Sequence, residues 1–360
     1  MLYYLVTRQH RHPIKDYLRH WGSHLVPHIN VLIYEELNQL RSLPLGTYIF
    51  SDIERLTPEQ TEMGSRAWEK LSSGGKSVCL LNHPTGSMRR YQLLRTLSER
   101  GLNQFNVYRL TELAQLPRFP IFLRAENDHD GNQTPLLKSL GELDNAIAVF
   151  KQQGKSLEDK IITEFCDTSD QSGIFRKYSA FLIGQRIIPR SIYFSQHWML
   201  KSRTNDLTNE QTRWEEQQYI ETNPHEAQLR EIFRLANIQY GRIDYSLLNG
   251  VPQVWEINTN PGALRIHPTE RLERVSGVSI SEFFSAQFEL AFQAIDYQLQ
   301  AKPVIANWTA PKIPLIRQNL QGQTRQSLLI LDYIFSWLPP GVQIKVLRKF
   351  KVCKNGSVTN

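Results

Sequence analysis

The sequence predicts a mixed α/β protein whose N-terminal lobe carries a parallel sheet. Short apolar runs alternate with helical segments over residues 1–105, which is typical of parallel strands joined by covering helices. Two later stretches are typical of antiparallel hairpins, one around Gly184 and one around Asn249-Gly250. Hydrophobic residues make up 41% of the 360 residues, which is ordinary for a chain that buries a core.

In the N-terminal lobe, strands are expected over 2–6, 31–34, 47–50 and 77–81, where apolar residues follow one another. A helix is expected from 58 to about 71, because Thr57 can cap it, Pro58 suits its first turn and Gln60 can complete a capping box. A second helix is expected over 88–99, before Gly101.

The rest of the chain is expected to mix strands, helices and a linker. Strands are predicted over 105–109, 119–123, 160–165 and 191–200, with a hairpin over 175–188. Helical spacing is predicted over 135–153, 210–220, 225–236, 281–299 and 326–337. Residues 303–314 contain three prolines and are interpreted as a linker. Residues 344–354 form a basic run that could bind an acidic protein, RNA or an anionic membrane surface, and these alternatives stay open.

The hairpin at 241–262 carries three oxygen-bearing side chains that we expect to meet. Glu256 and Asn258 are two residues apart and so share a face of their strand, while Asp244 lies on the partner strand. Such hard oxygen ligands suit Mg²⁺ that bridges phosphates. Arg242 shares the face of Asp244 and is expected to meet a phosphate.

The register of this hairpin sets a condition on that prediction. A plain two-residue turn at Asn249-Gly250 pairs Asp244 with Trp255, which places Asp244 and Glu256 on opposite faces. The side chains of Asp244 and Glu256 can therefore share a face only if the hairpin contains a bulge or a three-residue loop. Pro252 favours an irregularity nearby, because proline is poorly suited to a regular ladder.

With its Asn-Thr-Asn-Pro-Gly tail, this stretch resembles the metal-binding hairpin of the ATP-grasp superfamily, of the glutathione synthetase-like type, across roughly residues 75–265. The resemblance implies an N-terminal α/β lobe (1–105), a small α+β subdomain (106–166), a large subdomain with the hairpin (167–300) and a helical C-terminal extension (301–360). It also implies ATP as cofactor, with Mg²⁺ (or Mn²⁺) on Asp244, Glu256 and Asn258.

The resemblance also indicates the phosphate-binding side chains. Arg90 and Arg124 stand where many family members carry lysines that reach the nucleotide phosphates, and arginine keeps a permanent charge there. Arg242 and Arg124 are the candidate catalytic residues, expected to stabilise phosphate oxygens. Arg176 and Lys201 occupy regions that face phosphate or substrate in the family. The loop after Arg124 holds His129, whose role as a base is left open.

The adenosine end of the nucleotide is expected near residues 164–170. The segment with Glu164, Phe165 and Cys166 matches the one whose backbone meets the adenine edge in the family. Asp170 or Asp167 matches the acid that holds the ribose hydroxyls.

Composition and charge exclude some classes of protein. The net charge of +7 suits anionic substrates and is weak evidence for nucleic acid binding. Three scattered cysteines form neither a disulfide framework nor a zinc site, and the N-terminus lacks the pattern of a signal peptide. No apolar run is long enough for a membrane span. A cytoplasmic protein is expected, and a homodimer is compatible with the sequence.

The resemblance implies ATP-dependent ligation. A small-molecule or peptide carboxylate becomes an acylphosphate, and an amine or thiol acceptor displaces the phosphate. Two alternatives stay open: a phosphotransferase acting on a sugar or other hydroxyl, and a nucleotide-binding module whose catalysis is weakened by the missing lysines.

Overall fold

The structure is a computed structural model that describes residues 1–75, 78–112, 117–128, 131–201, 205–264, 274–275, 278–296 and 305–307. The chain divides into two compact units, Met1–Pro311 and Lys312–Asn360. The second unit lies wholly outside the described residues, as do His129, the predicted helix 326–337 and the basic run 344–354.

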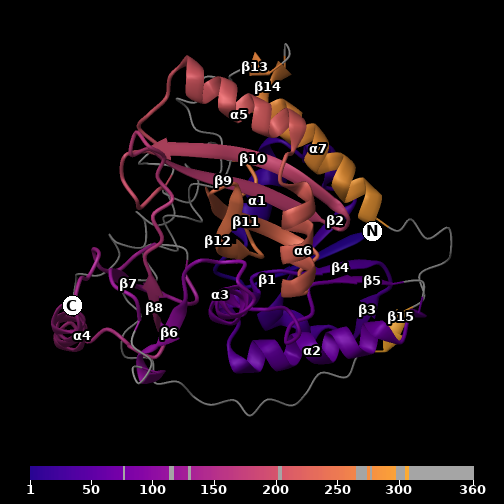
Figure 1. The fold of residues 1–360 in the computed structure, drawn as a ribbon. Coiled ribbons are helices and arrows are strands. Elements are labelled where there is room, and N and C mark those ends of the chain that lie inside the picture. Colours follow the sequence, from indigo (N-terminus) through magenta and orange to yellow (C-terminus); the bar gives the residue numbers. More distant parts are fainter. Residues whose placement is uncertain are drawn as a thin grey trace, which may run out of the picture. The chain divides into compact units, whose positions relative to one another are not determined.

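The predicted N-terminal lobe is a four-stranded parallel sheet in the order β2-β1-β4-β5. Its strands are β1 (Leu2–Val6), β2 (Ile29–Ile33), β4 (Thr47–Phe50) and β5 (Cys79–Leu81). Every residue of β1 and β4 is buried, which agrees with the unbroken apolar runs in the sequence. The expected mixed α/β class is confirmed (Figure 1).

Helices of this lobe follow the capping signals where these are present. Helix α2 (Pro58–Ser72) begins with the predicted capping box between Thr57 and Gln60. Helix α3 (Arg90–Glu99) matches the second expectation. Helix α1 (His12–His20) was not predicted, although Pro13 in its first turn and its buried Ile14, Tyr17 and Leu18 are a helical signal.

A second, smaller sheet is antiparallel and has the order β6-β8-β7. It consists of β6 (Val107–Arg109), β7 (Ile121–Ala125) and β8 (Lys160–Glu164), and α4 (Leu140–Gln152) packs on its apolar face. In β7 the side chains alternate, so Ile121 and Leu123 enter this small core while Phe122 and Arg124 face the other way.

The third sheet is antiparallel in the order β10-β9-β11-β12. Its strands are β9 (Phe175–Ile183), β10 (Arg186–Ser195), β11 (Tyr240–Leu248) and β12 (Val251–Asn258). The predicted separate strand over 191–200 is wrong, because β10 runs on past Pro189 with a local register shift and ends at Ser195.

The two faces of this third sheet differ in polarity and in the helices that pack on them. One face is apolar and packs against α3, α5 (Glu210–Thr222) and α6 (Glu226–Ala236). The other face packs α7 (Ile280–Ile295) at one end, through Phe284 and Phe288 against Phe181. Toward the far end that same face turns polar and lines a cavity.

The predicted linker contains a strand. Residues of β15 (Ile305–Asn307) pair antiparallel with β3 (Ser42–Pro44) of the N-terminal lobe, so this part of 303–314 is not a plain linker. A further pair joins β13 (Arg274–Val275) to β14 (Val278–Ser279). The 3-10 turns η1 (Ser23–Leu25), η2 (Tyr34–Gln39), η3 (Ile53–Arg55) and η5 (Leu110–Glu112) complete the described elements.

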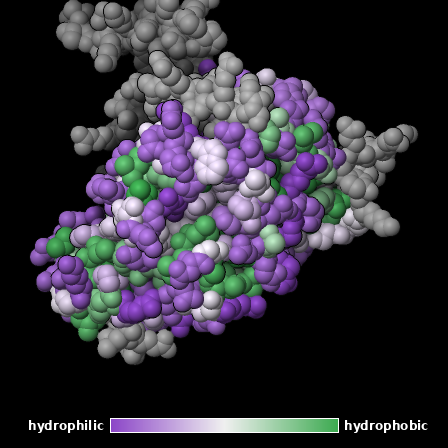
Figure 2. Space-filling model, turned by 45° about the horizontal axis from the view of Figure 1, so that its top comes forward, coloured by the Kyte–Doolittle hydropathy of each residue, from purple (hydrophilic) through white to green (hydrophobic). Residues whose placement is uncertain are grey.

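The surface in Figure 2 is mostly hydrophilic, with apolar residues in separate small groups. Large apolar side chains that are exposed, such as Val26 and Trp214, stand on different elements of the chain. Within the described ranges, no helix combines the length and apolarity needed to cross a membrane.

Candidate nucleotide and substrate cavity

The β11–β12 hairpin contains the predicted bulge. The turn itself is a two-residue turn, since Leu248 pairs with Val251, and Asn249 and Gly250 have positive φ angles of 53° and 77°. The register then shifts between Asp244 and Tyr245, so that Asp244 pairs with Glu256. The irregularity therefore lies at Trp255 and not at Pro252, which pairs in register.

This bulge has a clear anchor in the side chain of Trp255. Its indole stacks on Phe105 with ring centroids 4.8 Å apart, and its Nε1 donates a hydrogen bond to Ser246 Oγ at 2.9 Å. With Trp255 accommodated as the extra residue, Glu256 moves to the same face as Asp244. The two carboxylates meet as the sequence required.

The polar face of the third sheet forms one wall of a cavity of about 1000 Å³. Because side chains alternate along a strand, Lys177 and Ser179 face the cavity while Arg176 and Tyr178 face the opposite side. The charged or amide side chains that this sheet contributes to the lining are Lys177, Arg190, Arg242, Asp244, Glu256 and Asn258.

Asp244 is buried and held by two cations. Arg242 Nε donates to its Oδ1 at 2.7 Å, and Lys177 Nζ lies 3.4 Å from its Oδ2. Burial alone would lower the pKa of Arg242, but the charge and hydrogen bond of Asp244, together with the charge of Glu256, outweigh that effect and the pKa rises. Arg242 therefore stays charged at neutral pH beside the cavity.

Glu256 is the counterion of two buried arginines. Its Oε2 accepts from Arg90 Nη2 and, at 2.9 Å, from Arg124 Nη2. Arg90 also donates to the backbone carbonyls of Ala125, at 2.6 Å, and Asp128, at 2.6 Å. Burial lowers the pKa of Arg124 to about 10, and the Arg90 charge adds to this, yet Arg124 stays protonated at neutral pH.

The predicted metal ligands come together, but with donors already on their oxygens. Besides the four cations on the two carboxylates, Asn258 Oδ1 accepts from the Asn260 backbone N–H at 2.8 Å. No group of three or more His, Cys, Asp or Glu side chains in the described part of the chain could hold a metal ion. The oxygens of Asp244, Glu256 and Asn258 thus accept from protein groups in this arrangement, and the metal site stays a prediction.

An aromatic wall stands beside these charges. Trp198 contacts Phe122 and Phe165, with ring centroids 5.1 Å and 5.7 Å apart. All three line the cavity together with Cys166, whose pKa is raised to about 11 by burial, so it is a neutral thiol. Lys201 also lines the cavity and lies against Gly131, where an added Cβ would come 2.4 Å from its Nζ.

Four of the predicted site residues lie outside the cavity lining. Glu164 accepts hydrogen bonds from the backbone N–H of Arg118, at 2.7 Å, and from Tyr108 Oη, at 3.0 Å. Asp170 and Arg176 bind each other, with Nη1 2.6 Å from Oδ2. Arg90 lies behind Glu256, as described above. The predicted residues that do line the cavity are Arg124, Phe165, Cys166, Lys201, Arg242, Asp244, Glu256 and Asn258.

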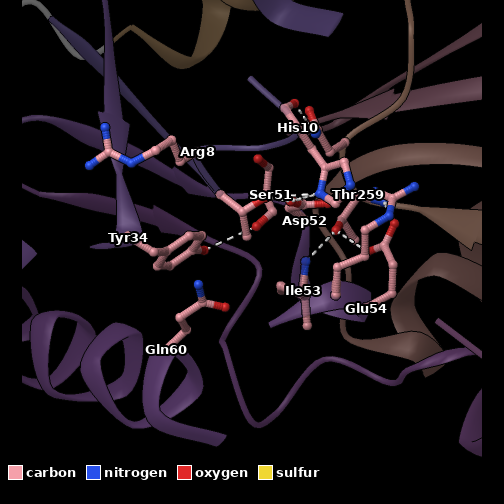
Figure 3. A network of polar contacts seen from close by, with 12 residues as sticks. Arg8, His10, Tyr34, Ser51, Asp52, Ile53, Glu54, Gln60 and Thr259 are labelled. Atoms are coloured by element: carbon pink, nitrogen blue, oxygen red, sulfur yellow. Dashed lines mark hydrogen bonds and ion pairs between the residues drawn. The ribbon is translucent and has the colours of Figure 1, made fainter. Parts of the chain in front are cut away.

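A polar network at the ends of β1 and β4, on the N-terminal lobe, contributes another part of the cavity lining (Figure 3). Asp52 has no exposed surface, and its oxygens bind His10 Nδ1 at 3.0 Å and Arg55 Nη1 at 2.6 Å. His10 and Arg55 both line the cavity. None of these three residues is predicted from the sequence.

The network is tied to the end of the β11–β12 hairpin. Thr259 Oγ1 donates to Glu54 at 2.5 Å and accepts from the Ile53 backbone N–H at 2.9 Å. Asn260 Nδ2 donates to the His10 carbonyl at 2.8 Å. The Asn-Thr-Asn tail of the hairpin thus connects the two walls of the cavity.

A sequence signal for the missed residues existed. His10 and Asp52 each closely follow a predicted strand of a parallel sheet, which is where such sheets bind ligands. Lys177 alternates with the apolar Tyr178, Ala180 and Leu182 and therefore belongs to the polar face, which Arg176 does not.

Neither a protein-family model nor a curated protein matches this sequence. Solved structures are similar to the chain at low identity. The D-alanine–D-alanine ligase from Bacillus anthracis complexed with ATP is 12% identical, with a TM-score of 0.45 over 81% of this chain and 97% of that one. The L-amino acid ligase from Bacillus licheniformis is 14% identical, with a TM-score of 0.40 over 72% and 66%. A RimK domain protein, ATP-grasp, from Sphaerobacter thermophilus DSM 20745 is 13% identical, with a TM-score of 0.41 over 79% and 98%.

Proposed function

We propose that the chain is an ATP-dependent ligase that activates a small-molecule or peptide carboxylate and joins it to an amine or thiol. The observation that carries this proposal is the single cavity of about 1000 Å³, which has a cation-rich wall, an aromatic wall and a separate polar wall on the N-terminal lobe. A ligase needs room for a nucleotide and two further substrates in contact, and this volume matches that need.

The cation-rich wall suits the phosphates of ATP. Arg124, Lys177, Lys201 and Arg242 line it, and their charges exceed those of Asp244 and Glu256. Guanidinium groups hold phosphate oxygens through paired N–H donors and keep their charge when buried. Charge that develops in phosphoryl transfer would be stabilised by these groups.

The aromatic wall suits the base of the nucleotide. Phe122, Phe165 and Trp198 offer flat apolar surfaces next to Cys166, whose backbone belongs to the segment expected at the adenine edge. The order of these segments along the chain is the order in the ATP-grasp superfamily, which supports the proposal. The predicted Mg²⁺ stays a prediction, and no step here depends on it.

The test is ATP turnover by the purified chain with a panel of amino acids and dipeptides as carboxylates and of amines and thiols as acceptors, with and without MgCl₂. The ligase proposal expects ADP and inorganic phosphate only when both substrates are present, and a condensed product by mass spectrometry. A phosphorylated substrate without inorganic phosphate would support the phosphotransferase. Tight ATP binding without turnover would support the nucleotide-binding module.

A further inference from the structure

The network around Asp52 has no part in the phosphate chemistry proposed above. Its hydrogen bonds hold a buried carboxylate next to the cavity. Asp52 directly follows Ser51 at the end of β4 and adopts a left-handed backbone conformation with φ of 60°. Such a conformation is uncommon outside glycine and is maintained when the surroundings require it. Here it places a carboxylate that has no exposed surface under the cavity wall.

That carboxylate presents two side chains to the cavity. Its Oδ1 accepts from Arg55 and its Oδ2 from His10, and the side chains of Arg55 and His10 remain 18% and 25% exposed. A fully buried carboxylate needs such partners, because an unpaired buried charge is costly. The arrangement therefore fixes both side chains at the edge of the cavity.

The hydrogen bonds also determine which nitrogen of His10 carries the proton. Thr7 Oγ1 gives its proton to Asp52 Oδ2 and can only accept from His10 Nδ1, which lies 2.9 Å away. Nδ1 therefore carries the hydrogen that Asp52 and Thr7 share, so the neutral imidazole has its lone pair on Nε2. A histidine in this tautomer, backed by a carboxylate, is arranged to accept a proton at Nε2.

We propose that His10 is the general base of the second half of the reaction, an inference that rests on the proposed ligase function. Nε2 takes a proton from the ammonium form of the acceptor. The amine lone pair then attacks the acylphosphate carbonyl carbon, the C–O bond to phosphate breaks, and the departing phosphate takes the second amine proton. Asp52 is a positioning residue that stabilises the imidazolium formed on His10.

The surroundings of His10 fit an amine acceptor. The titratable and charged groups in and behind this wall are Asp52, Glu54, Arg55 and His12, and the hairpin contributes the neutral Asn260. Asp52 offsets the charge of Arg55, so an ammonium approaching His10 meets little net positive charge. The cation-rich wall, by contrast, favours the acylphosphate.

The experiment separates the two halves of the reaction. Acylphosphate formation is trapped with hydroxylamine as a hydroxamate, and complete ligation is followed with the most active carboxylate–amine pair. His10→Asn should lower ligation by about 10²–10⁴-fold while ATP binding and the hydroxamate reaction change by less than about threefold. The loss should shrink at high pH, where the amine is already deprotonated, and imidazole should restore activity to His10→Ala.

His24→Asn is the matched control, because His24 is half exposed and pairs with Glu289 at 2.8 Å, away from the cavity lining. Long-range ¹H–¹⁵N NMR of histidine-labelled protein should find the neutral imidazole of His10 in the tautomer with its hydrogen on Nδ1. Unchanged ligation in His10→Asn, or the opposite tautomer, would overturn the assignment of the base alone. A parent protein without turnover on any pair would overturn the ligase function and the base with it.

Discussion

Replacing Glu256 with Gln removes a carboxylate that pairs with two buried arginines. Glu256 is 8% exposed, Arg90 4% and Arg124 7%, so water cannot substitute for the lost carboxylate. Removing one partner of a buried ion pair typically costs about 3–5 kcal/mol, since the other charge remains buried and unpaired. Arg90 keeps its bonds to the carbonyls of Ala125 and Asp128, so we expect a loss near the lower value, about 3 kcal/mol.

Urea unfolding followed by tryptophan fluorescence measures this loss directly. For a chain of 360 residues, a loss of this size corresponds to a fall in the melting temperature of roughly 4 °C. Glu231→Gln is the matched control, because its ion pair with Arg234 is exposed, and it should change stability by less than about 0.5 kcal/mol. Inorganic pyrophosphate should stabilise Glu256→Gln more than the parent, because it supplies negative charge to Arg124, which lines the cavity.

Two results would refute this reasoning. Equal stability of Glu256→Gln and the parent would show that the arginines do not depend on Glu256. A parent protein that Mg²⁺ alone stabilises, with the gain lost in Glu256→Gln, would show that the carboxylate is a metal ligand. The double variant Glu256→Gln/Arg124→Gln should recover part of the loss, since it leaves one buried charge fewer without a partner.

Three further outcomes follow from the geometry. Lys177→Gln should weaken ATP binding by roughly tenfold or more in calorimetry, while Arg176→Gln, one residue away on the opposite face, should not. Gly250→Ala should lower the free energy of unfolding by about 1–2 kcal/mol in urea, because φ is +77° there. Burial lowers the pKa of His225, so the unfolded chain binds a proton that the folded chain does not. Stability should therefore fall as pH drops below about 6.5, and less so in His225→Gln, as melting temperatures across pH would report.

Local signals in the sequence predicted much of the fold because each depended on neighbouring residues. The capping box at Thr57 and the buried runs of β1 and β4 are examples. The strand pairing of residues 305–307 with β3 joins segments more than 200 residues apart, and no local pattern announces it. The extension of β10 past Pro189 was missed because a bulge lets proline stay within a strand.

In the candidate site, too, features set by neighbouring residues could be predicted, while contacts between segments far apart in the chain could not. Register arithmetic required a bulge between Asp244 and Glu256, and the structure has it at Trp255. The reason why the bulge forms could not be predicted, because Trp255 stacks on Phe105, which is distant in the chain. Likewise the sequence located Arg90 and Arg124, but only the fold brings both to Glu256.

The placement of charge differs between the two walls of the cavity. On the sheet wall, each carboxylate is held by two cations, which leaves net positive charge where we propose that the phosphates of ATP bind. On the N-terminal lobe, the buried carboxylate of Asp52 faces His10 and one arginine, Arg55, whose charge it offsets. The Asn-Thr-Asn tail fixes the distance between these walls through Thr259 and Asn260. Loosening that connection, as in Thr259→Val, should therefore impair ligation more than ATP binding, because only ligation needs groups from both walls at once.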